Sequence, residues 1–344
     1  MNPYISDILS QPATLRNAVQ VFSPAALRSL VERIQGGDFD RIVLTGMGAS
    51  YHAGATAYVH LSGLPVPVFL VNAAELVHYL SGQVGTRTLL WINSQSGRSA
   101  ELKHLLERIS PQLPACLLAC VNDETSPLAL AADICLPIHA GPEATVSTKT
   151  YLNTLAVNLL AARQVAGYEV ETFRQEMLSI ADRMEAWLGE WGTRVRELDA
   201  MLGDFDELLI LGRGASMSAV GCGALINKEA AKCAFEGMQA ADFRHGPLEL
   251  VAPGFRAMLF AGSQVTSALN RNLAFDIVGS GGQVIWLDVE PAPGLPTFLL
   301  PPASDLARPL VEILPMQLLT LVMAERKGIA PGEFRVVGKV TTKE

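Results

Sequence analysis

An internal repeat is the feature that most constrains how this 344-residue chain can fold. The segment FDRIVLTGMGASYHAG resembles FDELLILGRGASMSAVG, and the pairs NAAELVHY with QAADFRHG and WINSQSGRS with FAGSQVTSA follow in the same order. The matched positions are Phe39/Phe205, Asp40/Asp206, Gly46/Gly212, Gly48/Gly214, Ala49/Ala215, Ser50/Ser216, Ala53/Ala219, Glu75/Asp242, His78/His245, Ser94/Ser263 and Gln95/Gln264. Three ordered matches at nearly constant spacing indicate two copies of one domain, each of about 130 to 140 residues.

Each copy alternates short apolar runs with segments that are compatible with helices. The first copy has the runs RIVLT, VPVFLV, TLLWIN and ACLLACV, and the second has ELLIL, AKCAF, RAMLFA and QVIWLDV. This alternation predicts βαβ units and therefore parallel sheets covered on both faces. We expect an α/β protein with two tandem doubly wound domains, joined by a helical stretch from about Tyr151 to Leu202.

Composition and charge exclude several classes of protein. Charged residues make up 17% of the chain and hydrophobic residues 49%, whereas about 25% charged residues is usual, so we expect extensive burial rather than disorder or a coiled coil. The net charge is −8 and the basic residues do not cluster, so no nucleic-acid partner is expected. The five cysteines show no CxxC spacing, which argues against a disulfide framework, a zinc ribbon or another bound metal.

The sequence pattern also predicts a protein without a membrane partner. Residues 42–74 contain no Asp, Glu, Lys or Arg, but Gly, Pro, Asn and His interrupt them, unlike a spanning helix. The first residues, MNPYISDILSQP, lack the basic start and apolar stretch of a secretory leader. We therefore expect a cytoplasmic location.

Three segments of the first copy are candidates for binding an anion, since ligands of open parallel sheets bind at the carboxyl ends of the strands. In the first, GMGAS, Gly48 and Ser50 lie at a helix start, but the following Tyr51 and His52 break the GxGxxG nucleotide pattern and disfavour NAD. In the second, SQSGRS (residues 94–99), hydroxyls, an amide and a glycine precede an expected helix over residues 100–109. This combination favours a phosphate site over an ordinary serine cap.

The third segment, ATVSTK, contains Ser147 and is equally consistent with a helix cap and with a sugar contact. The second copy reads SQVTSA where the first has SQSGRS, so only the first copy is expected to bind an anion strongly.

The second half of the chain supplies ionisable residues. Glu229 lies in an apolar helical stretch, either on a solvated face or partly buried with a raised pKa that would suit a general base. His245 precedes Gly-Pro and is therefore expected in a turn, where it can reach a ligand. Lys339 lies in the C-terminal segment GKVTTKE, and such tails are ordinarily frayed.

The motifs SQSG, STK and HGPL, with a lysine five residues before the last residue, together resemble the sugar isomerase (SIS) family. The resemblance covers essentially the whole chain and is strongest to the two-SIS isomerase half of glucosamine-6-phosphate synthase. It implies flavodoxin-like SIS domains, a homodimer with shared active sites, a hexose or hexosamine 6-phosphate as substrate, and no cofactor or metal. It also implies an N-terminal arm (1–24), a phosphate-binding SIS domain (25–165), a helical linker (166–200), a second SIS domain (201–330) and an active-site tail (331–344).

The resemblance further implies roles for individual residues. Glu229 would move the proton between carbons 2 and 1, His245 would assist ring opening in the neighbouring subunit's site, and Lys339 would close over the sugar. The residues implied to bind the phosphate and the sugar are Gly48, Ser50, Ser94, Gln95, Ser96, Ser99 and Ser147.

Departures from the synthase pattern point to a different reaction. The sequence shows no N-terminal Cys nucleophile and no glutaminase domain, and Cys222 and Ile226 replace a Glu and a Lys of the family helix. Met47 and Ala49 replace a Cys and a Thr, and the STK loop is one residue shorter. We therefore expect an isomerising deaminase that converts glucosamine 6-phosphate to fructose 6-phosphate and ammonia.

Three alternatives stay open. The protein could be a deglycase of a phosphorylated sugar–amine adduct, an aminotransferase-like or plain ketose/aldose isomerase, or a non-catalytic sugar-phosphate sensor. The presence of Glu229, His245 and Lys339 together favours an enzyme over a sensor.

Overall fold

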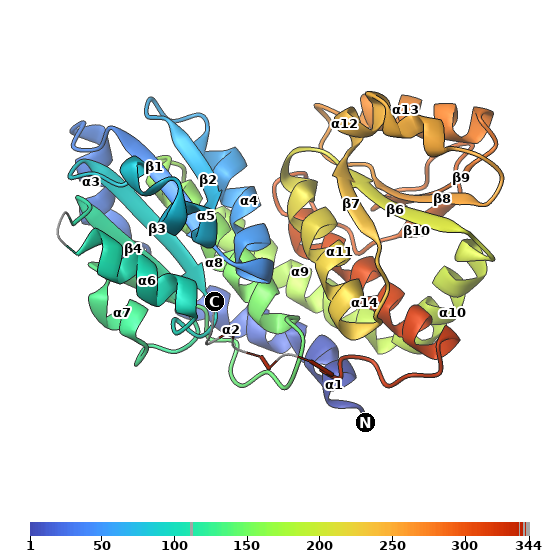
Figure 1. The fold of residues 1–344 in the computed structure, drawn as a ribbon, viewed down its shortest axis with the longest axis horizontal. Helices are drawn as coiled ribbons and strands as arrows, with labels where there is room; N and C mark the ends of the chain where they lie inside the picture. Colours follow the sequence, from blue (N-terminus) through green and yellow to red (C-terminus); the bar gives the residue numbers. More distant parts are fainter. Residues whose placement is uncertain (111–112, 337, 340, 342–344) are drawn as a thin grey trace. The chain divides into compact units, whose positions relative to one another are not determined.

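The computed structural model describes residues 1–110, 113–336, 338, 339 and 341, and the chain divides into two compact units. The β1–β5 unit comprises Ala13–Glu143, Ser147–Leu178 and the residues from Arg335 onward. The β6–β10 unit comprises Met1–Pro12, Ala144–Val146 and Ser179–Phe334. Each unit is named after its sheet (Figure 1).

The first part of the chain contains a five-stranded sheet and a series of helices. The strands are β1 (Arg41–Gly46), β2 (Val68–Asn72), β3 (Thr88–Ser94), β4 (Cys116–Val121) and β5 (Ile134–Pro137). The helices are α1 (Pro3–Leu9), α2 (Gln11–Val21), α3 (Arg28–Gln35), α4 (Gly48–Leu61), α5 (Ala73–His78), α6 (Ala100–Ile109), α7 (Pro127–Ala131), α8 (Lys149–Val165), α9 (Glu171–Gly189) and α10 (Trp191–Leu202), with 3-10 turns η1 (Pro24–Leu27) and η2 (Ser81–Gln83). Of these helices, α1 and α10 belong to the β6–β10 unit.

The second part repeats this architecture. The strands are β6 (Glu207–Gly212), β7 (Glu236–Gln239), β8 (Phe255–Phe260), β9 (Gln283–Asp288) and β10 (Thr297–Leu299). The helices are α11 (Met217–Ala230), α12 (Ala240–Arg244), α13 (Ser267–Gly279) and α14 (Pro309–Arg326), with 3-10 turns η3 (Gly214–Ser216) and η4 (Pro247–Leu250).

Both sheets have the same strand order and are parallel throughout. The first sheet has the order β2-β1-β3-β4-β5, and the second has the order β10-β9-β8-β6-β7. Counted from the first strand of each copy, both orders are 2-1-3-4-5, which is that of flavodoxin-like doubly wound sheets. The predicted fold class is therefore confirmed.

Helices cover both faces of each sheet because the strands are apolar on both faces. In the first sheet, alternate residues such as Val43, Leu90 and Ile92 pack in one core cluster with Leu76 of α5 and Leu105 of α6. Helices α4 and α8 pack together and contact strands of the same sheet. In the second sheet, α11 and α14 lie side by side, as Figure 1 shows in yellow and red.

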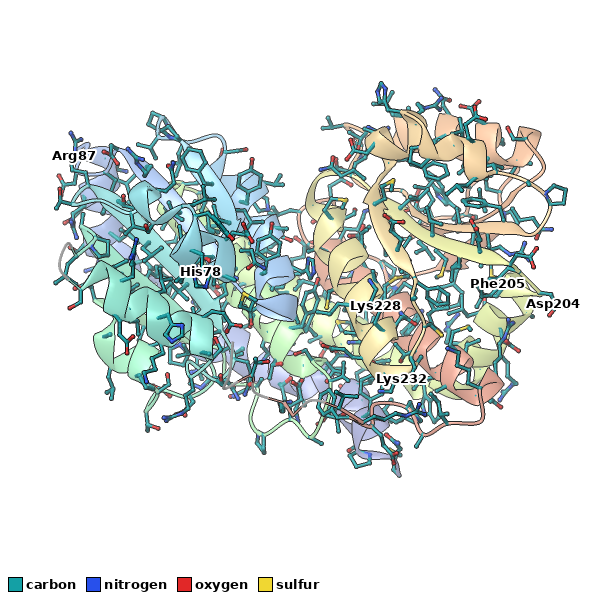
Figure 2. The ribbon with its side chains drawn as sticks, viewed as in Figure 1. His78, Arg87, Asp204, Phe205, Lys228 and Lys232 are labelled. Atoms are coloured by element: carbon teal, nitrogen blue, oxygen red, sulfur yellow. The ribbon has the colours of Figure 1, made fainter. Side chains whose placement is uncertain are left out.

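One predicted strand is wrong, and the local backbone explains why. The run AKCAF (231–235) precedes the strand, which begins at Glu236. Lys232 has a left-handed φ of 56°, and the N–H of Cys233 donates to the carbonyl of Asn227 at 3.0 Å, so these residues fold back on the end of α11. Figure 2 labels Lys228 and Lys232 at this end of the helix.

Other differences concern short elements and breaks. The sequence runs did not predict β5 and β10, which span only four and three residues. The helical stretch between the copies consists of α8, α9 and α10, and Gly167, with φ of 79°, follows the end of α8. Within the described residues, none of the helices combines the length and apolar composition needed to cross a bilayer. The cytoplasmic location stays a prediction.

Gly46 shows how tightly the strand ends approach each other. It is the last residue of β1 and lies opposite Asn93 of β3. A Cβ built on Gly46 would lie 2.8 Å from the backbone oxygen of Asn93, and backbone cannot move aside as a flexible side chain can. A glycine is therefore required where the chain leaves β1 for the GMGAS segment.

We predict that Gly46→Ala lowers the free energy of unfolding by about 1–3 kcal/mol, the usual cost of overpacking. Gly63→Ala is the matched control, because a Cβ there meets nothing within 4 Å. Urea unfolding of both variants measures the difference. Equal stability of the two variants would contradict the steric argument.

Candidate functional site

The SQSGRS segment forms a tight turn at the end of β3. The hydroxyl of Ser94 accepts the N–H of Gly97 at 2.9 Å, and the hydroxyl of Ser96 accepts the N–H of Arg98 at 3.2 Å. Gly97 has a φ of 59°, and a Cβ there would lie 2.1 Å from Oγ of Ser126. The turn therefore needs both hydroxyls as acceptors and a glycine, while each serine O–H can still donate to a ligand.

Helix α6 begins at Ala100, as the sequence predicted, with Ser99 as its N-cap. The Ser99 hydroxyl oxygen is buried and has no hydrogen-bond partner in the described part of the chain. The N–H of Ala100 donates to the carbonyl of Thr341 at 3.2 Å. Thr341 therefore lies at the start of α6, where the Ser99 hydroxyl also lies.

An ion pair and a backbone bond connect this turn to the end of β4. Arg98 donates to Asp123 through two nitrogens, at 3.1 and 2.9 Å, and Gln95 accepts the N–H of Asn122 through its carbonyl. Hydrogen bonds from Thr125 and then from Arg98 lower the pKa of the Asp123 carboxyl. Arg98 is thus paired with a carboxylate at the surface, and backbone N–H groups that donate to serine hydroxyls form the turn itself.

The STK segment is organised by a residue that the sequence analysis did not select, Glu143. Its Oε1 accepts the N–H of Thr148 at 2.9 Å, the hydroxyl of Thr148 at 3.0 Å and the N–H of Thr150 at 3.0 Å. Its Oε2 accepts the hydroxyl of Thr150 at 2.6 Å and Nζ of Lys339 at 2.8 Å. The half-buried Ser147 lies in the turn that these bonds fix, just before α8.

The GMGAS segment follows β1, the neighbour of β3. Gly48 has a φ of 52° and is the first residue of α4, and Ser50 is half-buried in the first turn of that helix. Gly46, the last residue of β1, pairs with Asn93 of β3. Ser94 follows Asn93 directly, so the SQSGRS segment begins beside the GMGAS segment.

The β1–β5 unit therefore brings together most of the predicted binding residues. Strand register joins the GMGAS and SQSGRS segments, Thr341 joins the tail to α6, and Glu143 joins Lys339 to the STK segment. The tail is not frayed at Lys339 and Thr341, because each makes a contact with the same unit.

Glu229 and His245 lie in the other unit, and their meeting with the binding residues in one site stays a prediction. Glu229 is half-buried in the last turn of α11, and His245 is exposed and caps the end of α12. Both helices contact β7. The turn expected at His245 is present, since Gly246 follows with a φ of 136°.

In the second copy, carboxylates accept hydrogen bonds from the counterparts of Ser50 and Gln95. The hydroxyl of Ser216, the counterpart of Ser50, donates to Glu312 at 2.8 Å. The N–H of Gln264, the counterpart of Gln95, donates to Asp305 at 2.7 Å. A carboxyl oxygen already accepts the donor at each of these loops, which is a further reason to expect strong anion binding in the first copy only.

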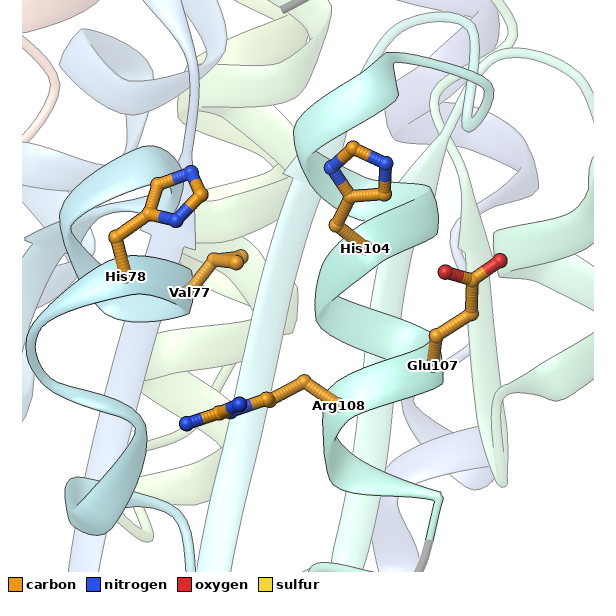
Figure 3. Close-up of a pocket in the computed structure, with 5 residues that line it drawn as sticks. All are labelled: Val77, His78, His104, Glu107 and Arg108. Atoms are coloured by element: carbon orange, nitrogen blue, oxygen red, sulfur yellow. The ribbon is translucent and has the colours of Figure 1, made fainter.

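Two surface grooves occupy equivalent places in the two copies, away from the predicted binding residues. The first, of about 410 Å³, lies between α5 and α6 and is lined by Val77, His78, His104, Glu107 and Arg108. Figure 3 shows Arg108 extending from α6 toward α5. The second, of about 500 Å³, lies between α12 and α13 and includes Arg213 and Arg244. Neither groove is lined by a residue that the sequence analysis selected.

Comparison with known proteins assigns the first copy to a class. A family model described as SIS domain matches residues 38–163, and the predicted resemblance is confirmed. The strand order of the second sheet repeats that of the first.

The relatives extend the likeness over nearly the whole chain. Glutamine–fructose-6-phosphate aminotransferase (isomerizing) of Pyrococcus horikoshii is 29% identical over 99% of this chain, which spans 57% of that relative's length. The C-terminal domain of glucosamine-fructose-6-phosphate aminotransferase from Francisella tularensis has a TM-score of 0.85 at 22% identity, covering 97% of this chain and 98% of that one. Glucosamine-6-phosphate deaminase from Thermotoga maritima has a TM-score of 0.78 at 19% identity, covering 99% and 100%. These structural likenesses establish the fold.

Glu312 predicts a pH dependence of stability. Burial raises its pKa from 4.5 to about 7, so between these values the folded state binds more protons than the unfolded state. Stability should therefore fall as the pH rises through this window, by up to about 3 kcal/mol.

Glu312→Gln should remove this dependence, because the amide is neutral at every pH. Urea unfolding at about pH 5 and about pH 8 should show the variant gaining stability relative to wild type at the higher pH. Glu325→Gln, an exposed change on the same helix, is the control. The same loss of stability in the Glu312 variant as in wild type would contradict the assignment.

Proposed function

We propose that this protein is a phosphosugar isomerase that converts glucosamine 6-phosphate and water to fructose 6-phosphate and ammonia. The observation that carries the proposal is the assembly in one unit of the SQSGRS turn, the STK segment and Lys339, linked by the contacts of Thr341 and Glu143. The names of the relatives, which contain fructose 6-phosphate and glucosamine 6-phosphate, support the substrate class.

The phosphate would bind at the turn between β3 and α6. The hydroxyls of Ser94, Ser96 and Ser99 and the start of α6 supply donors that suit a dianion. Gln95, and Ser50 and Gly48 at the start of α4, would add donors from the neighbouring strand end. Ser147 and Lys339 would contact the sugar from the STK segment and the tail.

Glu229 and His245 would carry the proton transfers in this proposal. His245 would help to open the sugar ring, and Glu229 would take the proton from carbon 2 and return it to carbon 1. The product is an imine at carbon 2, which water hydrolyses to the ketone of fructose 6-phosphate and ammonia. General acid–base groups of this kind contribute about 10²–10⁴-fold each.

The alternatives give different products from the same site. A deglycase would release a free amino acid or other amine from a phosphorylated adduct, and a plain isomerase would interconvert aldose and ketose phosphates without ammonia. A sensor would bind the sugar phosphate and turn over none of these substrates. Assays for ammonia, free amine and fructose 6-phosphate on the purified protein separate the four outcomes.

We predict that Glu229→Gln lowers kcat for ammonia release by about 10²–10⁴-fold, because the amide cannot accept the carbon-bound proton. Lys228→Gln, an exposed change beside it, should keep near wild-type activity. A coupled assay for ammonia measures both. Near wild-type release by Glu229→Gln would rule out its role as the base.

We predict that Ser99→Ala raises KM for the sugar phosphate by about tenfold or more with kcat little changed, because it removes one donor to a charged group. Ser110→Ala, at the opposite end of α6, is the control. Steady-state kinetics with glucosamine 6-phosphate measure both variants. An unchanged KM for Ser99→Ala would remove this hydroxyl from the phosphate site.

A further inference from the structure

The buried carboxylate of Glu143 has no role in the reaction proposed above. Its side chain has no exposed surface, although it carries a carboxylate. It accepts five hydrogen bonds, from Thr148, Thr150 and Lys339. A buried carboxylate is costly unless donors and a counter-charge compensate it, so loss of the counter-charge should matter more than loss of one neutral donor.

The two oxygens of Glu143 have separate tasks. Oε1 accepts the N–H groups of Thr148 and Thr150 and the hydroxyl of Thr148, which fixes the turn that contains Ser147. Oε2 accepts hydrogen bonds from the Thr150 hydroxyl and the Lys339 ammonium, which fixes the position of the Lys339 ammonium. Glu143 therefore connects the STK segment to Lys339, which follows Glu143 by 196 residues in the sequence.

We propose that Glu143 is a positioning residue that holds Lys339 and the Ser147 turn in fixed relation, so that the lysine is preorganised to contact a bound sugar phosphate. The proposal rests on the function proposed above. Lys339 has four rotatable side-chain bonds, so a buried anchor at Nζ reduces the side-chain entropy lost when the lysine contacts a ligand.

Glu143→Gln separates the two tasks of the carboxylate. The amide oxygen can still accept from the turn at the Oε1 position. Its NH₂ group at the Oε2 position would face the Lys339 ammonium, and two donors cannot bond to each other. The hydroxyl of Thr150 can rotate to accept instead, so the lysine loses the most. Glu143→Asp keeps the charge and should restore part of the anchor.

A double-mutant cycle tests whether Glu143 acts through Lys339. We expect Glu143→Gln to lower kcat by about 10- to 100-fold, as displacement of a catalytic group does. In the Lys339→Met background, the same change should have little further effect, since coupled residues are not additive. Full additivity of the two changes, at wild-type-like folding by circular dichroism, would overturn the proposal.

A second measurement does not depend on catalysis. Acylation of lysines by an N-hydroxysuccinimide ester, read by mass spectrometry, reports whether Nζ of Lys339 is held in the ion pair. In Glu143→Gln the acylation rate of Lys339 should rise about tenfold or more, the loss expected for one hydrogen bond to a charged group. Lys103, whose side chain is 74% exposed, should react equally in both proteins and is the internal reference.

Thr150→Val completes the design. It removes one hydrogen bond from the same oxygen of Glu143 but keeps the ion pair, so Lys339 should stay protected from acylation. Unchanged acylation of Lys339 in Glu143→Gln would overturn the anchor even in an active enzyme. If the wild type turns over no phosphosugar but the acylation rate rises as expected, the proposed function fails and the anchor stands.

Discussion

The parallel register of β1, β3 and β4 is the constraint on which the rest of the structure depends. Gly46 pairs with Asn93, and Ser94 pairs with Val121, so three successive strand ends deliver their loops to one edge of the sheet. The glycine at the end of β1 permits the close approach. The hydroxyls that follow these strands are functional candidates because the register, and not their order in the chain, makes them neighbours.

The two copies share one architecture but differ in the hydrogen-bond partners of their equivalent loops. In the first copy, the hydroxyl of Ser99 is buried without a partner among the described residues. In the second copy, Glu312 and Asp305 accept from the equivalent loops. A carboxylate on the chain satisfies the same donors that a phosphate would, so sequence repetition alone does not imply two sites.

Much of the fold could be predicted because its signals are local and repeated. The apolar runs and their spacing predicted a doubly wound α/β fold, and the serine before Ala100 predicted the start of α6. The strand near 231–235 was misplaced because its apolar residues also suit the end of a buried helix, and only the left-handed Lys232 breaks the pattern. The site was predicted in part: the loops carry recognisable motifs, but Glu143 has no motif of its own. The signal available was an acidic residue four positions before Ser147, and its importance appears only when Lys339 folds back to it.

The division of the chain has a consequence for its modularity. The residues from Arg335 onward belong to the β1–β5 unit, although the helix before them, α14, belongs to the other unit. A fragment containing only residues 13–178 would keep the first sheet and bury the Glu143 carboxylate without its cation. The repeat therefore does not give two independent domains. Cutting the gene between the copies would separate Glu143 from Lys339, the lysine that pairs with its buried carboxylate.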